Sequence, residues 1–375
     1  KRIDTGVWPD ARVQFSPRVG FTWSLNEEES IKLRGGTGIF SGRLPLVFFT
    51  NMPTNAGMVQ GSAALVTKYD ANGNVTSVDP RLAQLAGPMI TDVDEMISRL
   101  GLQNTISPED GALPRDINAV DPNFKMPQVW KSSLALDYEV PVSFPMTVTV
   151  EGIYTKTING VMLQNYDLKD PDGTWDRFNG ADDRYIYPST NDLSYNKLNA
   201  YVLANTSEGW GAIGNITVHA QPVKDLRLMG AYTYTESKEI SGMPGSNAAS
   251  AYGGLVGVNG PHIPQLERSQ YVVPHKAIGS LSYKLPWAIG NFQSATFINL
   301  FYTGGSTYGY SYTYSNDMNG DGIAADLIYI PKGKGDIKFV SAADEDAFFK
   351  FMDQDSYLKN NKGKYAGANA TTNPW

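Results

Sequence analysis

The sequence predicts an all-β fold, a transmembrane antiparallel β-barrel with short periplasmic turns and long extracellular loops. Long segments alternate apolar and polar residues, and short turns alternate with long polar, glycine-rich stretches. Aromatic residues make up 11% of the chain and charged residues only 18%. Mean hydropathy is −0.30, and no run approaches the roughly 18 apolar residues of a membrane-spanning helix. Barrel strands escape this hydropathy test because every second residue is polar.

The segment from Arg12 to Leu25, RVQFSPRVGFTWSL, shows the alternation most fully. Its odd positions are apolar, including Pro17, and its even positions are polar, cationic or glycine. Since side chains on a strand alternate faces, one face is wholly apolar. The length exceeds the usual strand of about 5–6 residues and fits the roughly 9–11 residues that cross a bilayer. Pro17 removes one ladder hydrogen bond, which favours a sheet edge or a bulge at that point.

Further strands are predicted in pairs around short turns. We expect them near residues 31–39, 124–140, 146–157, 210–221, 226–237, 271–285 and 292–302. The short turns near 27, 142, 223 and 288 alternate with predicted extracellular loops at 41–123, 167–196, 240–268 and 304–375. The first loop contains two short helical patches, at 80–86 and 92–100. This one-sided asymmetry is typical of outer-membrane barrels. A secreted β-sandwich, the alternative fold, has shorter strands with turn signals about every 8–12 residues.

Composition narrows the function classes. The chain has no cysteine, which excludes disulfides and thiolate metal sites. The net charge of −7, without a basic cluster, argues against nucleic acid as a partner. The opening KRIDTGVWPD lacks the apolar segment of a signal peptide, so we expect a mature chain or an internal part of a longer one.

Several segments carry a family resemblance. They are FSPRVGFTWSLNEEESIKLRGGTGIF with the following GRLP, FKMPQVWKSSLALDYEVP, NTSEGW, DMNGDGIAADLIYIP and the tail from AFFKF onward. In this order they resemble the barrel region of TonB-dependent outer-membrane receptors of the Oar-like group. The resemblance implies a 22-stranded barrel filled by a plug domain. Because about eight spanning strands are recognisable, we predict that residues 1–375 form a partial barrel that lacks the plug and the final strand.

The resemblance also implies a function and partners. A receptor of this group resides in the outer membrane of a Gram-negative bacterium and imports a large solute through the plugged barrel. It contacts outer-membrane lipid, meets TonB through the plug region that is missing here, and can associate with a surface lipoprotein or another envelope complex. The alternatives are a passive porin, a structural or assembly barrel, or a secreted calcium-stabilised β-sandwich that binds a ligand.

The segment Asp317-Met318-Asn319-Gly320-Asp321-Gly322 is the sharpest local motif. Calcium takes six to eight oxygen ligands, and D-x-N-x-D-G places side-chain oxygens at alternate positions of a glycine-permitted turn. The predicted structural calcium ligands are Asp317, Asn319, Asp321, the Ile323 carbonyl and Asp326. An EF-hand ends in glutamate at its twelfth position, where this chain has Ile328. The alternative is an ordinary turn between strands at 310–314 and 327–330.

Two further groups of residues are predicted to contact solute or water. Within the loops and at the strand beside them, the candidate ligand contacts are Tyr185, Tyr187, Tyr195 and Trp210. On the polar strand faces, the predicted lumen-facing residues are Arg12, Arg18, Lys32, Arg34, Lys131, Glu151, Arg227 and Lys284. The lumen can hydrate these charges or pair them with a plug, whereas lipid would destabilise them by about 2–4 kcal/mol each at the midplane. The sequence has no GxSxG, HExxH or P-loop motif, and we expect no enzyme activity.

Overall fold

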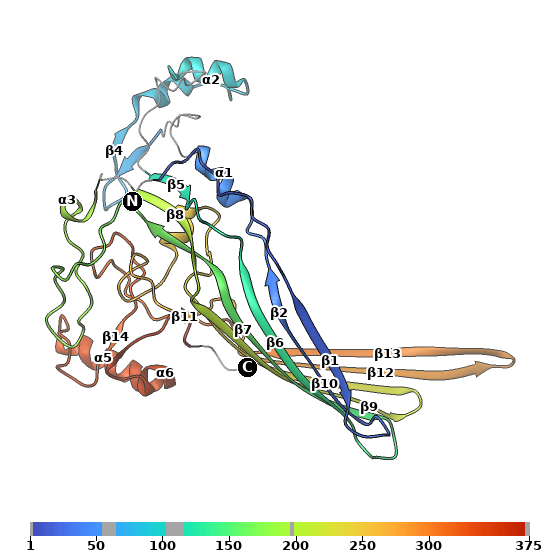
Figure 1. Ribbon diagram of the computed structural model, residues 1–375. Coiled ribbons are helices and arrows are strands. Elements are labelled where there is room, and N and C mark those ends of the chain that lie inside the picture. The colour runs from blue at the N-terminus through green and yellow to red at the C-terminus, as the bar shows by residue number, and fades with distance from the viewer. Residues whose placement is uncertain (1–2, 55–64, 103–115, 196–198, 372–375) are drawn as a thin grey trace.

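The computed structural model describes residues 3–54, 65–102, 116–195 and 199–371. Its main feature is a curved sheet in which eight long strands of the described residues follow one another antiparallel (Figure 1). In sheet order these strands are β1 (Arg18–Ser24), β2 (Ile31–Ser41), β6 (Gln128–Glu139), β7 (Met146–Asn165), β9 (Gly209–Val223), β10 (Leu226–Glu239), β12 (His275–Ile289) and β13 (Phe292–Gly305). Among the described residues, no helix is both long and apolar enough to span a membrane.

Connections at the two ends of the sheet differ in length. Residues 25–30, 140–145, 224–225 and 290–291 join consecutive strands by short turns. The other connections, at 42–127, 166–208, 240–274 and after 305, are long and gather at the opposite end of the sheet (Figure 1). The predicted asymmetry between turns and loops is confirmed.

Register aligns the apolar residues of successive strands on one face. One row across the sheet runs Trp23, Leu33, Leu136, Val150, Ile216, Tyr232 and Ala277. The neighbouring row runs Ser24, Lys32, Asp137, Thr149 and Thr217 on the other face. Large side chains of the apolar face are exposed, including Trp23 at 63% and Val150 at 52%. We call the face with the apolar row the outer face and the opposite one the inner face.

The first strand is shorter than its sequence pattern predicts. β1 begins at Arg18, so residues 12–17 of the predicted strand lie outside it. Pro17 explains the boundary, because it has no N–H to donate and only its carbonyl still pairs, accepting from the Ile39 N–H at 3.0 Å. On the N-terminal side of Pro17, a side-chain hydrogen bond takes the place of the backbone hydrogen bonds between strands: Gln128 Nε2 donates to the Phe15 carbonyl at 3.1 Å.

The long first connection is more ordered than we expected. It contains α1 (Val47–Thr54), a hairpin of β3 (Thr67–Tyr69) and β4 (Val75–Val78), η1 (Pro80–Leu85), α2 (Val93–Arg99) and β5 (Asp116–Val120). The helices η1 and α2 confirm the two predicted helical patches, each started by an aspartate that caps its first N–H groups. The prediction of a region without strands was wrong, because β5 pairs in parallel with β8 (Asn199–Thr206). A pairing between segments so far apart in sequence leaves no local pattern.

Strand β7 is long enough to bridge wall and loops. Its first part pairs with β9 and its last part, from Gly160, pairs with β8. A buried cluster forms where β5, β7 and β8 meet α1 and α4 (Ala248–Gly253), with Phe48, Val120, Leu163, Leu203 and Tyr252 among its members. The loops at this end are therefore packed against one another by apolar side chains.

A second buried cluster lies within the last connection. It contains Leu327, Ile330, Met352, Leu358 and Ala366, each at most 2% exposed. Leu327 precedes β14 (Tyr329–Ile330), and the others come from β14, α5 (Ala342–Gln354), α6 (Ser356–Asn360) and the segment after β15 (Lys364–Tyr365), while Val258 joins the cluster from the connection 240–274. The remaining described elements are α3 (Thr190–Leu193) and β11 (Glu267–Arg268), which pairs with the end of β10.

We predict that a charge on the outer face destabilises the protein in a bilayer. Ile216→Lys in the middle of β9 should lower the free energy of unfolding by about 2–4 kcal/mol, because lipid cannot hydrate the ammonium group. Thr217→Lys, one residue along on the inner face, is the matched control and should cost much less. Urea unfolding in lipid vesicles measures both, and equal destabilisation would contradict the assignment of the faces.

Candidate functional site

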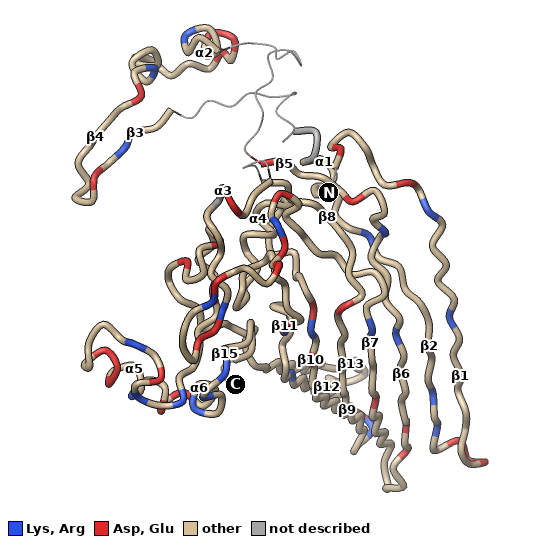
Figure 2. The backbone as a smooth tube through the Cα atoms, turned by 60° about the vertical axis from the view of Figure 1, so that its left-hand side comes forward, with Lys and Arg blue, Asp and Glu red and all other residues tan. Residues whose placement is uncertain are grey.

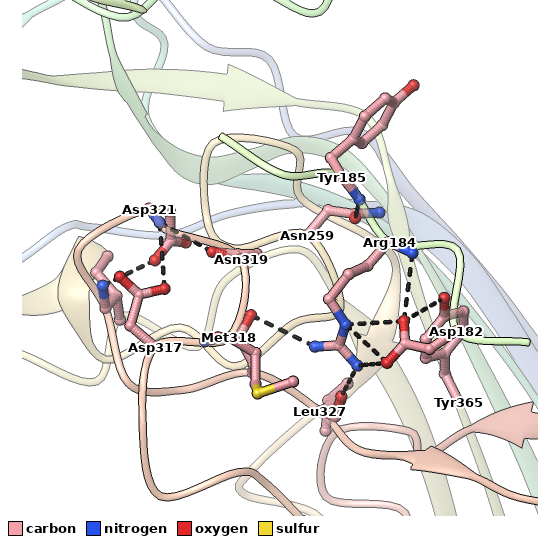
Figure 3. A network of polar contacts seen from close by, with 12 residues as sticks. Asp182, Arg184, Tyr185, Asn259, Asp317, Met318, Asn319, Asp321, Leu327 and Tyr365 are labelled. Carbon is pink, nitrogen blue, oxygen red and sulfur yellow. Dashed lines mark hydrogen bonds and ion pairs between the residues drawn. The ribbon is translucent and has the colours of Figure 1, made fainter. Parts of the chain in front are cut away.

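Two long connections, 166–208 and the one after 305, meet around the side chain of Arg184, which is fully buried. Its Nε donates to both carboxylate oxygens of Asp182, at 2.9 and 3.0 Å, and its Nη2 donates to the Leu327 carbonyl at 2.8 Å (Figure 3). Nη1 lies 3.7 Å from Oδ1 of Asp326, and the Tyr365 hydroxyl donates to Asp182 at 2.9 Å. A buried cation needs such partners because burial removes its hydration. Arg184 therefore fixes the connection 166–208 to the last one.

The Asp317 motif lies beside this network and forms a compact turn. Asp317 accepts from the backbone N–H of Gly320 at 2.7 Å through Oδ1, and from Gly322 at 2.8 Å through Oδ2. Asn319 Oδ1 accepts from the Asp321 N–H at 2.9 Å. Both glycines have positive φ, +83° and +87°, a conformation that other residues rarely adopt. The motif thus satisfies its own backbone N–H groups with its side-chain oxygens.

Two further predicted calcium ligands follow the same pattern. Asp321 Oδ1 accepts from the Ile323 N–H at 2.7 Å, and Asp326 Oδ2 accepts from the Met318 N–H at 2.7 Å. Throughout the described ranges, no three Asp, Glu or His side chains are grouped as a metal ion requires. The turn is explained by hydrogen bonds alone, and calcium binding stays a prediction.

The second carboxylate oxygen of Asp321 is buried and has no hydrogen-bond partner within the described structure. It points at Gly260, where a side chain would begin only 1.8 Å from it, so the close approach requires glycine at that position. Burial, with smaller contributions from Asp326 and Asp317, raises the pKa of Asp321 to about 7. This carboxyl group is therefore the titratable group of the turn that changes charge near neutral pH.

An aromatic cluster covers the same region of the loops. The ring of Trp175 lies 4.8 Å from that of Tyr187 and 5.8 Å from that of Tyr185, and it stacks on His262. The guanidinium of Arg177 lies 3.9 Å over the Tyr185 ring. The structure thus brings together two predicted ligand contacts, Tyr185 and Tyr187, with Trp175, Arg177 and His262.

These aromatic residues differ in accessibility. Tyr187 is 6% exposed, and its hydroxyl donates to the Asn259 carbonyl at 2.7 Å, so it supports the cluster from below. Burial is the main cause that raises its pKa far above the usual range, followed by the charge of Asp321. Tyr185 is half-buried, and its N–H donates to the Asn259 side chain at 2.9 Å. Figure 3 shows its ring pointing away from the Arg184 network.

The other two predicted ligand contacts lie apart from this cluster. Tyr195 is 62% exposed, and the Lys169 ammonium lies 5.8 Å from its ring centre. Trp210 stands on the outer face of β9, in register with Lys156 of β7 and Lys238 of β10. Its place beside a loop in the sequence therefore does not put it with the loop tyrosines.

The inner face of the wall carries a charged group of its own. Arg34 Nε donates to Asp137 Oδ2 at 2.8 Å, and Nη1 lies 3.8 Å from Oε1 of Glu151. Thr149 donates to the other oxygen of Asp137 at 2.7 Å. These four residues come from β2, β6 and β7, so the network crosses three strands on the polar side of the sheet.

A match to a known protein family identifies the kind of protein that this sheet belongs to. A family model described as an outer membrane beta barrel domain matches residues 2–315. The chain belongs to this family. It is an outer-membrane protein of a Gram-negative bacterium, and its sheet is barrel wall. No curated protein matches the sequence.

Three solved structures match the chain at low sequence identity and low TM-score. The outer membrane transporter YddB from Escherichia coli shares 9% identity at a TM-score of 0.34, over 78% of this chain and 33% of that one. The copper transporter OprC shares 10% identity at a TM-score of 0.28, over 78% of this chain and 31% of that one. The siderophore receptor PirA from Pseudomonas aeruginosa shares 10% identity at a TM-score of 0.25, over 80% of this chain and 36% of that one. The chain spans about a third of the length of each of these proteins.

In the barrel wall, most of the charges predicted for the lumen lie on the inner face. By register this face presents Arg18, Lys32, Arg34, Lys131, Glu151, Arg227 and Lys284. Arg18 lies 4.2 Å over the ring of Phe40, and Lys32 pairs with Glu29 at 3.0 Å. Arg12 precedes β1 and therefore has no place on a strand face.

Sequence reasoning missed Arg184, Trp175 and Asn259, which organise the loops of this outer-membrane barrel. Arg184 stands in the polar run ADDRYIYP, where a buried cation has no local signal. The Leu327 carbonyl that it donates to and the Tyr365 ring beneath its guanidinium are more than a hundred residues away. The abundance of Asp and Tyr predicted that the region is a loop, but it did not predict which residues pair within that loop.

We predict that Asp321 makes the stability of the loops depend on pH. Its pKa rises from an ordinary 3.8 to about 7 on folding, so the folded state holds the proton more tightly. Its contribution is most favourable below about pH 4 and is lost as the pH rises through 7. Asp321→Asn should abolish this loss in thermal unfolding between pH 5 and 8. An unchanged pH profile in the variant would contradict the assignment.

The same titration tests calcium. A bound cation favours the ionised carboxylate, so calcium should raise the unfolding temperature of the natural protein at pH 8 and have little effect on Asp321→Asn. No shift at millimolar calcium would exclude the cation.

Proposed function

We propose that this protein is a TonB-dependent outer-membrane receptor of the Oar-like type that imports a large solute. One observation carries the proposal: the long connections at one end of the wall contain two buried apolar clusters and an aromatic cluster with a guanidinium beside it. Figure 2 shows where Lys and Arg residues stand in these connections and along the strands of the wall. A recognition surface above a polar passage is what solute uptake needs. The TonB step rests on the sequence resemblance.

Recognition is assigned to the exposed part of the aromatic cluster. Arg177 is exposed, and Trp175 and Tyr185 are half-buried, while Tyr187 and Asn259 hold them from below. Rings offer large contact areas with little loss of conformational entropy, and the adjacent guanidinium adds charge and hydrogen-bond donors. Because the cluster is anchored to the Arg184 network, its geometry is set before a solute arrives, which lowers the entropic cost of binding.

Passage is assigned to the inner face of the barrel wall. Hydrogen bonds join Arg34 and Thr149 to Asp137 there, an ion pair joins Arg34 to Glu151, and Asn215 lies in register with Thr233 on the next strand. Such side chains keep the lumen hydrated and can pair with a plug domain. In the proposed mechanism, TonB remodels the plug after the solute has bound to the loops.

A transport experiment that surveys many solutes at once tests the proposal. Cells that express the protein, with and without TonB, are grown in a defined rich medium, and mass spectrometry identifies which solutes disappear. We expect depletion of a specific set of large solutes that requires TonB. Depletion that persists without TonB would indicate a passive porin, and no specific depletion would favour a structural or assembly barrel.

The aromatic cluster gives the specific prediction. Trp175→Ala combined with Tyr185→Ala should reduce TonB-dependent uptake at least about tenfold, because buried aromatic contacts in binding sites are commonly worth about 2 kcal/mol or more. Tyr69→Ala is the control, since Tyr69 is also a tyrosine of the long connections, 62% exposed, but lies in the β3–β4 hairpin. Equal uptake by both variants would remove the cluster from the binding surface.

A further inference from the structure

A row of aromatic and basic side chains crosses the outer face of the barrel wall at its loop end. Trp130, Lys156, Trp210, Lys238 and Arg268 are successive register partners on β6, β7, β9, β10 and β11. We call these five residues the interface row. Contacts within the sheet agree with this register, because the Trp130 ring packs edge-on against the outward Tyr154 at 6.2 Å.

The height of Trp210 in the interface row matches one boundary of a membrane. About ten residues of β9 separate Trp210 from Ala220 near the short turns, a rise of roughly 33 Å along the strand or roughly 23 Å at a tilt of about 45°. The apolar band of outer-membrane barrels is about 25 Å tall. Trp23 of β1, 63% exposed, marks the opposite boundary beside a short turn. Trp210 therefore lies at the level of the outer-leaflet headgroups, and Lys156 and Lys238, one strand to either side, lie within about 4 Å of that level at the same tilt.

Charge on the outer face is confined to this level. On the described strands, the outer positions between the interface row and the short turns include no Lys, Arg, Asp or Glu apart from Glu236, which stands one position below the row. Glu236 forms an ion pair with Arg268. Lys156 and Lys238 form no ion pair with any described residue. Lys156 and Lys238 thus direct two positive charges at the membrane without an ion pair, and Lys238 also interacts electrostatically with Glu267.

We propose that the interface row binds the phosphate groups of the phosphorylated glycolipid that forms the outer leaflet. Lys156 and Lys238 flank Trp210, and neighbouring strands lie about 4.8 Å apart, so the two ammonium groups can reach phosphates of one headgroup. Long lysine side chains keep their charge at the headgroup level while their stems lie on apolar surface. The tryptophan rings fit the boundary between sugar and acyl chains. This site is independent of the solute and of TonB.

Native mass spectrometry of the protein purified from outer membranes tests the proposal. The probe is bisphosphorylated lipid A added to detergent micelles, compared with the same lipid after removal of its phosphates. The natural protein should bind the phosphorylated form preferentially. Lys156→Gln with Lys238→Gln should weaken that binding by on the order of thirtyfold, since each basic residue near an anionic membrane surface contributes about fivefold. Lys156→Arg with Lys238→Arg should retain it.

The matched control removes two lysines from the inner face of the same wall. Lys131→Gln with Lys276→Gln should leave lipid binding unchanged, because register places both side chains away from lipid. Equal binding by the natural protein and the Lys156/Lys238 glutamine variant would overturn the proposal, as would equal affinity for the dephosphorylated lipid. Displacement of the lipid by millimolar inorganic phosphate would also overturn it, by assigning the row to a soluble anion.

Discussion

Every backbone N–H and C=O group of a membrane-spanning strand has to be paired by a neighbouring strand, because lipid offers no hydrogen bonds. In this chain that pairing also sorts the side chains, since the register from β1 to β13 keeps one apolar row aligned over seven strands. A slip of one residue at any pair would turn lysines such as Lys32 or Lys131 towards lipid. The same register that satisfies the backbone therefore fixes which side chains meet lipid, lumen and headgroups.

The loops depend on this wall for their position and on buried side chains for their order. β7 continues past the part that pairs with β9 and carries β8 and β5 with it, which places the first hydrophobic cluster directly on the strand ends. The second cluster is joined to the connection 166–208 through Arg184. As a result the aromatic cluster of Trp175 and Tyr185 belongs to connections that two buried apolar clusters hold in place.

The wall could be predicted from the sequence because strand alternation is local and repeats every two residues. The row Leu33, Leu136, Val150 and Ile216 is readable strand by strand, and the short turns fix which strands are neighbours. The strand start at Arg18 was missed because alternation continues through Pro17 although the ladder cannot. The β5–β8 pair and the Arg184 network join segments that the chain keeps far apart, and no local pattern records such contacts. Trp210 is a different case, because the alternation that places Ile216 on the outer face also places Trp210 there, whereas its nearness to a loop had suggested a ligand contact.

Cysteine scanning along β9 tests the assignment of the two faces most directly, and the chain has no native cysteine to interfere. Single cysteines from 210 to 221 would carry spin labels in lipid vesicles, and collision with oxygen and with a water-soluble nickel complex would be measured at each. We predict a period of two, with even positions such as 214, 216 and 218 accessible to oxygen and odd positions accessible to nickel. Accessibility to the nickel complex at every position, or an alternation of opposite phase, would contradict the account.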